Sequence, residues 1–289
     1  MFNMKNRIRL LTMLLLASIS MNIHLSAQDT LWINTGEWHQ SMDTMSVLRY
    51  NASAVFDTSN VALINPEETA LLLTVINNDS QAHTFALDGL DNFGVEILPA
   101  DTITFEVPPM AAGTYRYFSN NQRGTYLGLS GILKVGLNMP NQFHWNLSDC
   151  MPERMDSVDV EGELLDEEPY VPRYFSINSY TYPNTTLDTN GLVALNLGDS
   201  CTISIVNSGF MDHVLHFHGF HVKYLTTTIQ SSRIGWIKDT VPVLQGEAIT
   251  LLLVANQVGI YPVHNHNLIA VTNSGFYPGG MLTLINITP

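Results

Sequence analysis

Residues 201–219 read CTISIVNSGFMDHVLHFHG, and this stretch decides the fold. Its first six residues are rich in β-branched side chains and lead to Asn207, the pattern of a buried strand that ends in a turn. The following apolar run alternates with His216 and His218. Because residues two apart in an extended chain lie on the same face, these two imidazoles should project together. The stretch therefore predicts two strands joined by a turn, the second bearing a histidine pair.

Runs of the same kind extend outward on both sides of this stretch. Examples are residues 70–76, 103–107, 192–195, 248–254 and 281–285, and most of them are bounded by turn-forming Asn, Asp, Gly or Pro. No helical period of useful length appears in either half. Hydrophobic residues make up 45% of the chain and charged residues only 13%, as in a compact globular protein. We therefore expect an all-β protein made of two tandem β-sandwich domains.

The composition changes once along the chain and suggests where the two domains meet. Between Asp149 and Glu168 nine residues are acidic and few favour strands. A run of like charge is usually a solvated linker. The expected organisation is a first domain at 28–140, an acidic linker at 141–173 and a second domain at 174–289.

The first 27 residues have the anatomy of a secretory signal peptide. Three basic residues precede an apolar run at 10–17, and Ser26-Ala27 provides a small-residue cleavage site. Export to the periplasm, the cell surface or the medium is therefore expected, and no later segment is apolar enough to span a membrane. Removal of residues 1–27 takes the net charge from −14 to about −17, which disfavours nucleic acid as a partner. In an exported protein Cys150 and Cys201 can pair or stay free, and the sequence leaves both open.

A second histidine pair lies downstream, in the stretch GIYPVHNH at residues 259–266. His264 and His266 again share one face of an extended chain. One such pair is often coincidence or ordinary hydrogen bonding, but two pairs in one domain point to a metal ion. Imidazole suits copper, zinc, iron or nickel, so spacing alone leaves the metal open.

The second half of the chain resembles the last domain of multicopper oxidases. The resemblance rests on three segments of the sequence. They are Asn207 followed by His213-x-x-His216-x-His218-Gly219, the Trp-Ile-Lys-Asp-Thr-Val segment at 236–241, which resembles the family's Trp-x-Asp-Thr-Val, and Gly259-x-Tyr-x-x-His264-x-His266 closing at Gly280-Met281. It covers residues 174–287 and implies a Greek-key sandwich of the cupredoxin type, with copper as the cofactor. The first domain resembles the family's first domain in pattern.

The resemblance also implies a role for each matching residue. His213 corresponds to a type 1 (blue) copper ligand, with Met281 at the axial position. His216 corresponds to a type 2 ligand, and His218, His264 and His266 correspond to type 3 ligands of the trinuclear cluster.

Several positions depart from the family's pattern. Asn265 stands where the family has the type 1 cysteine, and Ala270 stands where it has a further histidine. A blue-copper site needs a thiolate, so the type 1 site is expected to be absent. An insert at 267–279 is longer than usual. In the first domain Ala86 and Asp88 replace the family's histidines, which leaves His83 as a structural residue.

The resemblance implies that each of two domains supplies half of the histidines of a trinuclear cluster, and this chain has only the half from its second domain. Three outcomes follow. The four histidines of the pairs hold copper by themselves, for storage, sequestration or limited redox chemistry. Alternatively, two chains complete a cluster across a homo-oligomer interface, which would make oxidoreductase activity conceivable. In the third outcome the site is a relic in a structural or adhesive sandwich. The catalytic residues are not identified. The sequence has no phosphate-binding glycine loop and no Gly-x-Ser-x-Gly elbow, which argues against nucleotide-binding and α/β-hydrolase functions.

Overall fold

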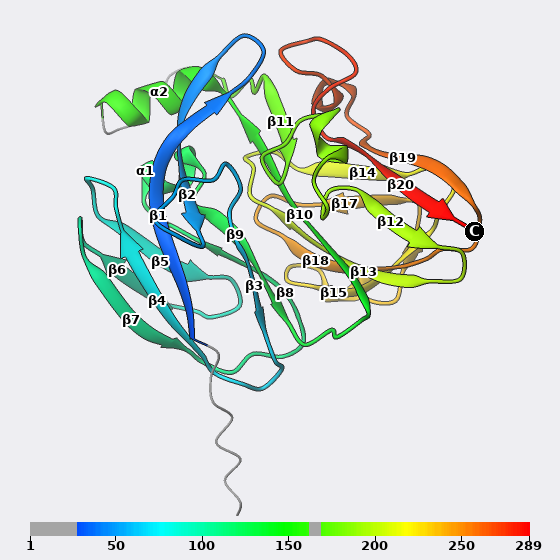
Figure 1. Cartoon of the computed structure of the whole chain (residues 1–289), viewed down its shortest axis with the longest axis horizontal. Coiled ribbons are helices and arrows are strands. Elements are labelled where there is room, and N and C mark those ends of the chain that lie inside the picture. Colours follow the sequence, from blue (N-terminus) through cyan, green and yellow to red (C-terminus); the bar gives the residue numbers. More distant parts are fainter. Residues whose placement is uncertain (1–27, 162–168) are drawn as a thin grey trace, which may run out of the picture.

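The structure is a computed structural model that describes residues 28–161 and 169–289. Two β-sandwiches lie side by side, the first from the blue to green part of the chain and the second from green to red (Figure 1). This arrangement confirms the predicted all-β fold with two tandem cupredoxin-like domains. The predicted signal peptide lies outside the described residues.

The first domain packs a four-stranded sheet on a five-stranded one. The four-stranded sheet has the order β2-β1-β4-β7, with β1 (Gln28–His39), β2 (Thr44–Asn51), β4 (Leu71–Asn77) and β7 (Thr102–Val107). The five-stranded sheet has the order β3-β9-β8-β5-β6, with β3 (Ala62–Asn65), β5 (His83–Leu87), β6 (Gly94–Ile97), β8 (Gly113–Phe118) and β9 (Ser130–Val135). In β3 and β7 exposed or half-buried residues alternate with more buried ones, because successive side chains point to opposite faces.

The second domain is built in the same way from a six-stranded and a five-stranded sheet. The larger sheet has the order β11-β10-β13-β18-β15-β16, with β10 (Asn141–Cys150), β11 (Tyr174–Ile177), β13 (Ser200–Asn207), β15 (Val222–Thr227), β16 (Ile237–Lys238) and β18 (Ala248–Val254). The smaller sheet has the order β12-β20-β19-β14-β17, with β12 (Val193–Asn196), β14 (His213–Phe217), β17 (Thr240–Val243), β19 (Gly259–Asn265) and β20 (Leu282–Thr288).

The segment expected to be an acidic linker, residues 141–173, is largely ordered secondary structure. Strand β10 pairs in parallel with β13, in the register of Asn141 with Cys201, so it is an inner strand of the second domain. It is followed by helix α2 (Pro152–Glu161). The acidic composition suggested a linker, but the apolar residues of this strand, such as Trp145 and Leu147, lie before the acidic run and are buried. Asp149, the first residue of the acidic run, is buried as well.

Each domain has its own hydrophobic core. The first core includes Leu31, Tyr50 and Phe85, and the second includes Trp145, Phe217 and Leu251, all almost without solvent contact. Trp145 stacks on Phe217 with ring centroids 5.8 Å apart, so β10 contributes the largest side chain of the second core. Both cores are large enough to support separately packed sandwiches.

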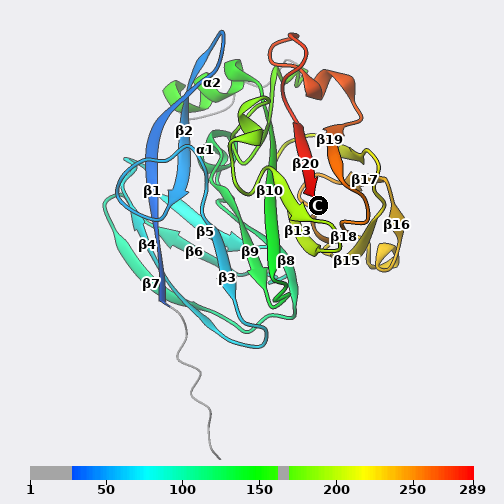
Figure 2. The ribbon, with the colours of Figure 1, turned by 45° about the vertical axis from the view of Figure 1, so that its right-hand side comes forward.

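The domains meet through strands β8 and β9 of the first and β13, β15 and β18 of the second (Figure 2). The contact combines an apolar cluster of Ile132, Val206 and Ala248 with pairs of hydroxyl groups. Thr114 Oγ1 lies 2.7 Å from Thr250 Oγ1, and Ser130 Oγ lies 2.7 Å from Ser208 Oγ. These paired hydroxyls satisfy each other, which allows polar groups to be buried between the sheets.

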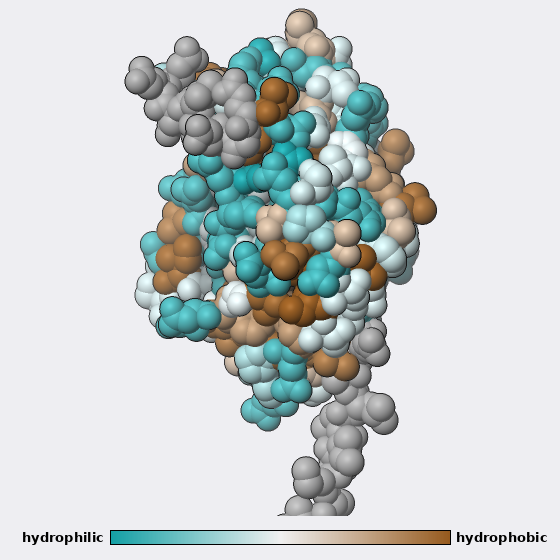
Figure 3. All heavy atoms as spheres, turned by 90° about the vertical axis from the view of Figure 1, so that its left-hand side faces the viewer, coloured by the Kyte–Doolittle hydropathy of each residue, from teal (hydrophilic) through white to brown (hydrophobic). Residues whose placement is uncertain are grey.

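The outer face of the molecule that belongs to the first domain mixes hydrophilic and hydrophobic residues (Figure 3). Helices α1 (Gln122–Leu127) and α2 cover one end of this domain, and the short 3-10 helices η1 (Asn184–Thr186), η2 (Ser231–Arg233) and η3 (Leu268–Val271) lie in loops of the second. Within the described residues no helix is both long and apolar enough to cross a membrane.

Candidate metal centre

Strands β14 and β19 bring the two predicted histidine pairs together. The strands are antiparallel neighbours, and their register places His216 directly opposite His264. His218 and His266 follow two residues later, each directly after the last residue of its strand, and their rings group with those of His216 and His264. Sequence reasoning thus identified both the pairs and their grouping.

The four rings form a compact group, which we call the imidazole cluster. The ring centroids of His216 and His218 are 4.6 Å apart, and those of His218 and His264 are 5.1 Å apart. His266 lies at the edge, 5.8 Å from His216 and 6.5 Å from His264. His218 and His266 are exposed and the other two are half-buried, so the cluster is open to solvent.

Hydrogen bonds fix the proton on His264. Its Nδ1 lies 2.8 Å from the backbone oxygen of Asn265, which can only accept, so Nδ1 carries the proton and Nε2 presents a lone pair. His218 Nε2 lies 3.0 Å from this Nε2 and therefore donates to it. His216 Nδ1 lies 3.1 Å from Thr240 Oγ1, which orients the third ring. Such second partners are what metal-binding histidines commonly have.

The distances fit a pair of imidazoles on one ion. A metal bonded at about 2.0 Å to two nitrogens that are 3.0 Å apart would subtend an angle of about 100°, within the range of common coordination geometries. Over residues 28–161 and 169–289, no group of three or more His, Cys, Asp or Glu stands in metal-ligand geometry. His216 and His266 are therefore neighbours of the pair in this conformation.

The surroundings of His218 favour its neutral form. Partial burial, together with the neighbouring His216 and His264, lowers the pKa of His218 from its ordinary value. A neutral imidazole has the lone pair that a metal needs, so crowding these rings prepares them as ligands.

The other two predicted ligands, His213 and Met281, lie inside the domain and away from solvent. Between them lies Asn265, whose Nδ2 is 2.9 Å from His213 Nδ1 and 3.5 Å from Met281 Sδ. All three side chains are at most 2% exposed. The amide thus makes the contacts that a type 1 copper would make with the histidine and the methionine. Asn265 Oδ1 accepts from the Asn267 backbone, which completes its hydrogen bonding.

Neither domain offers the thiolate that a blue-copper site needs. Cys150 and Cys201 are both free and lie in different cores, and burial raises the pKa of Cys201 to about 12. Ala270, at the position of the family's further histidine, is also buried and accepts a hydrogen bond from the Met281 backbone. The residues around His213 therefore do not fit a type 1 copper ion.

Sequence reasoning missed the partner of His213 on its other side. Asp149 Oδ2 lies 2.9 Å from His213 Nε2 and also accepts from the backbone of Phe210 and Met211, while Tyr170 donates to Oδ1 at 2.6 Å. Because the ring accepts from Asn265 at Nδ1, it carries its proton at Nε2 and donates to Asp149. The available signal was that Asp149 takes the next position, two residues after Leu147, in the alternation of apolar residues at 143, 145 and 147.

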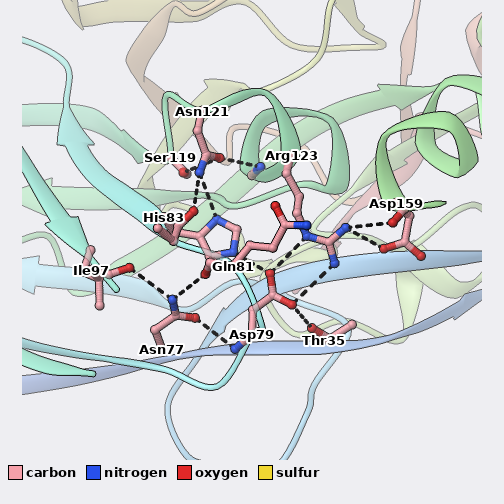
Figure 4. A network of polar contacts seen from close by, with 12 residues as sticks. Thr35, Asn77, Asp79, Gln81, His83, Ile97, Ser119, Asn121, Arg123 and Asp159 are labelled. Carbon is pink, nitrogen blue, oxygen red and sulfur yellow. Dashed lines mark hydrogen bonds and ion pairs between the residues drawn. The ribbon is translucent and has the colours of Figure 1, made fainter. Parts of the chain in front are cut away.

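A related network surrounds His83 in the first domain (Figure 4). His83 Nε2 lies 2.8 Å from Asp79 Oδ2, and Asp79 also receives Arg123 Nε at 3.1 Å. Arg123 reaches on to Asp159 of helix α2 at 2.7 Å. Asn121 Nδ2 lies 3.5 Å from the other ring nitrogen of His83. His83 is fully buried and paired, in agreement with a structural role.

A family model described as multicopper oxidase matches residues 166–277, which contain the imidazole cluster, His213 and Asn265. The second domain is thus similar in sequence to multicopper oxidases. Among curated proteins, none matches the sequence.

Solved structures extend this likeness to both domains. A blue copper oxidase from Nitrosomonas europaea has 21% identity, covering 90% of this chain and 85% of that one, with a TM-score of 0.76. A copper nitrite reductase from the same organism has 14% identity, covering 91% of this chain and 94% of that one, with a TM-score of 0.69. At these identities the likeness establishes the fold. The whole chain thus shares the two-domain fold of these structures, and residues 166–277 match the multicopper oxidase model.

Proposed function

We propose that this chain is an exported copper-binding protein that holds copper at the imidazole cluster of its multicopper oxidase domain. The observation that supports this most directly is the 3.0 Å separation of His218 Nε2 and His264 Nε2, with the His264 proton held on Nδ1. Export rests on the signal-peptide pattern of residues 1–27.

Copper bound at these rings would supply one-electron exchange between its two common oxidation states. The chain's own part is to prepare the ligands. His264 is ready, since its Nε2 has no proton, whereas His218 must give up the proton that it donates to His264, either to its own Nδ1 or to solvent. His216 and His266 are the further imidazoles next to this pair.

Storage or sequestration of copper fits the chain better than oxidase turnover. The position of the type 1 cysteine is filled by Asn265, whose amide is hydrogen-bonded to His213 and Met281. An electron from a reducing substrate therefore lacks the usual entry site. A relic site in a structural or adhesive sandwich is the alternative.

Metal analysis tests the proposal. The purified protein, loaded with copper and desalted, should retain about one copper per chain and melt at a higher temperature, since a ligand that binds only the native state stabilises it. H218A/H264A should lose the metal. H39A is the matched control, because it removes a surface histidine outside the cluster. The proposal would be wrong if the double variant retained as much copper as the parent protein, or if the parent protein retained none. The relic site would then be the better description of the cluster.

The same samples separate the remaining outcomes. Competition between zinc and copper for the protein identifies the metal that it prefers. The exposed positions of His218 and His266 leave them accessible to a second copy, so light scattering with and without copper tests whether a homo-oligomer completes the cluster. Oxygen consumption with a phenol, present in the parent and lost in H218A/H264A, would instead assign oxidoreductase activity.

A further inference from the structure

A cleft of about 390 Å³ lies between the two domains, away from the imidazole cluster. Its walls come from the end of β1, the turn that follows it and Thr58 in the first domain, and from residues 179–184 and Asn273 of the 267–279 insert in the second. Figure 1 shows the blue β1–β2 turn and the red insert loop at the same end of the molecule. The volume is within the range of small-molecule sites.

Side-chain contacts hold the three walls in place. Asn273 Nδ2 donates to Thr181 Oγ1 at 3.2 Å, and Thr181 Oγ1 donates to Gln40 Oε1 at 3.3 Å. These two hydrogen bonds join the insert, the 179–184 segment and the first domain. The longer insert, noted from the sequence, thus supplies Asn273 to the cleft.

Ser179 of the cleft lining belongs to a strained turn that is hydrogen-bonded to the first domain. Asn178 and Ser179 have φ values of 53° and 67°, a left-handed conformation that is uncommon outside glycine. Their carbonyl oxygens accept from Ser59 Oγ at 2.8 Å and from Trp38 Nε1 at 2.9 Å. Strain of this kind persists only where surrounding contacts impose it, so the cleft is preorganised.

The lining limits the chemistry of a ligand. Of the described residues, no lysine or arginine lines the cleft, which disfavours phosphates and carboxylates. No aliphatic side chain other than Pro183 lines it either, which disfavours lipids. Glu37 and His39 line the rim as an exposed pair 3.4 Å apart. The rest of the lining consists of aromatic rings, including Tyr180 and Tyr182, among amide and hydroxyl side chains.

Several of these polar groups have no protein partner within the described chain. They are the side-chain amide of Asn184, the Nε2 of Gln40 and the hydroxyls of Tyr180 and Tyr182. Amides and phenols both donate and accept, and tyrosine rings present an apolar face beside a polar tip. Together they match a ligand with hydroxyl groups around its edge and C–H groups on its faces.

We infer that this interdomain cleft binds a neutral saccharide, with Tyr180 and Tyr182 as ring platforms and Gln40, Asn184 and Asn273 as hydroxyl partners. This site is independent of copper. A protein that carries both would keep its metal close to a glycan surface.

Calorimetric titration with neutral hexasaccharides tests the inference. The probes are cellohexaose, laminarihexaose, chitohexaose, maltohexaose and mannohexaose, each added to the full exported chain. At least one should bind saturably, and Y180A/Y182A should weaken it at least tenfold. Y277A is the matched control, since Tyr277 is an exposed aromatic residue of the same insert that does not line the cleft, and its binding should stay within twofold.

Q40A/N184A provides a second test that leaves the aromatic rings in place, and it should also lower affinity at least tenfold. Melting temperature and copper retention, unchanged in all variants, show that the fold and the imidazole cluster are intact. Absence of binding by every probe would overturn the inference. So would unchanged affinity in Y180A/Y182A, or tighter binding of polygalacturonate fragments than of any neutral probe.

Discussion

His83 in the first domain and His213 in the second begin equivalent strands, yet their carboxylate partners come from different parts of the chain. Each histidine stands six residues after a strand-ending asparagine, Asn77 or Asn207. Each asparagine donates to the backbone oxygen four residues on and accepts from the amide two residues on. The two turns therefore have the same hydrogen-bonding pattern.

The carboxylate itself is supplied in two ways. In the first domain it belongs to Asp79, two residues after Asn77. In the second domain that position is Gly209, and a Cβ placed there would lie 2.0 Å from Asp149 Oδ2. A carboxylate from β10 thus fills the space that the missing side chain leaves. Both domains therefore contain a buried histidine that is hydrogen-bonded to a carboxylate, which comes from the turn in the first domain and from strand β10 in the second.

The largest expected effect is the loss of Asp149. D149A removes the acceptor for His213, Tyr170 and two backbone amides, all buried, and should lower the free energy of unfolding by about 4 kcal/mol in urea titrations. D149A/G209D moves the carboxylate to the position that Asp79 has in the first domain and should recover about half of this. D101A, an exposed carboxylate, is the control, with a change of about 0.5 kcal/mol or less. No recovery in the double variant would mean that the two turns are not interchangeable.

The second prediction separates the buried His213 from the half-buried His264 of the imidazole cluster. H213Q should lower the free energy of unfolding by about 2 kcal/mol and leave copper retention unchanged, because His213 is buried against Asp149 and Asn265. H264Q should do the reverse, weakening copper at least tenfold with a change in stability below about 1 kcal/mol. Copper lost from H213Q, at unchanged stability, would move the metal to the buried position.

The third prediction concerns pH and the first domain. Burial would raise the pKa of Asp79, but hydrogen bonds from His83 and Arg123, with the charge of Arg123, outweigh it and hold the pKa well below its usual range. A lowered carboxyl pKa contributes stability that is present above about pH 4 and lost as the pH falls further. D79N should therefore be less stable than the parent by about 2 kcal/mol at pH 7. The difference should shrink below pH 4 in urea titrations, and a constant difference would show that Asp79 acts through packing.

The smallest change in stability is expected when a blue-copper site is rebuilt. N265C/A270H places a thiolate between His213 and Met281 and returns the missing histidine to the loop whose Ala270 carbonyl accepts from the Met281 backbone. Copper(II) should then give an intense visible band, since copper–thiolate bonding produces it. N265S/A270H is the matched control without a thiol and should stay colourless. A colourless cysteine variant that retains an extra copper would show that the buried geometry differs from a type 1 site.

The sequence predicts the fold well because strand patterns and turn residues are local. It also predicts the grouping of His216, His218, His264 and His266, because period-two spacing puts the members of each pair on one side of an extended chain. The register of His216 with His264 and the tautomer of His264 could not be derived, since they depend on pairing and on a backbone oxygen. Asp149 was missed because its role arises from a parallel pairing between β10 and β13, over residues far apart in the chain. The acidic composition predicted a linker there, but β10 is a buried strand that includes Asp149.

The position of β10 has a consequence for how this chain can be divided. A fragment cut at residue 174, where the change in composition suggests a boundary, would lose an inner strand of the six-stranded sheet along with Trp145 and Asp149. It would expose two strand edges, β11 and β13, that the intact protein keeps covered, and open edges promote aggregation. A fragment that starts at residue 141 keeps the sheet whole. The structural unit of the second domain therefore begins at β10, before the acidic stretch. Any exchange of this domain between proteins would have to include β10.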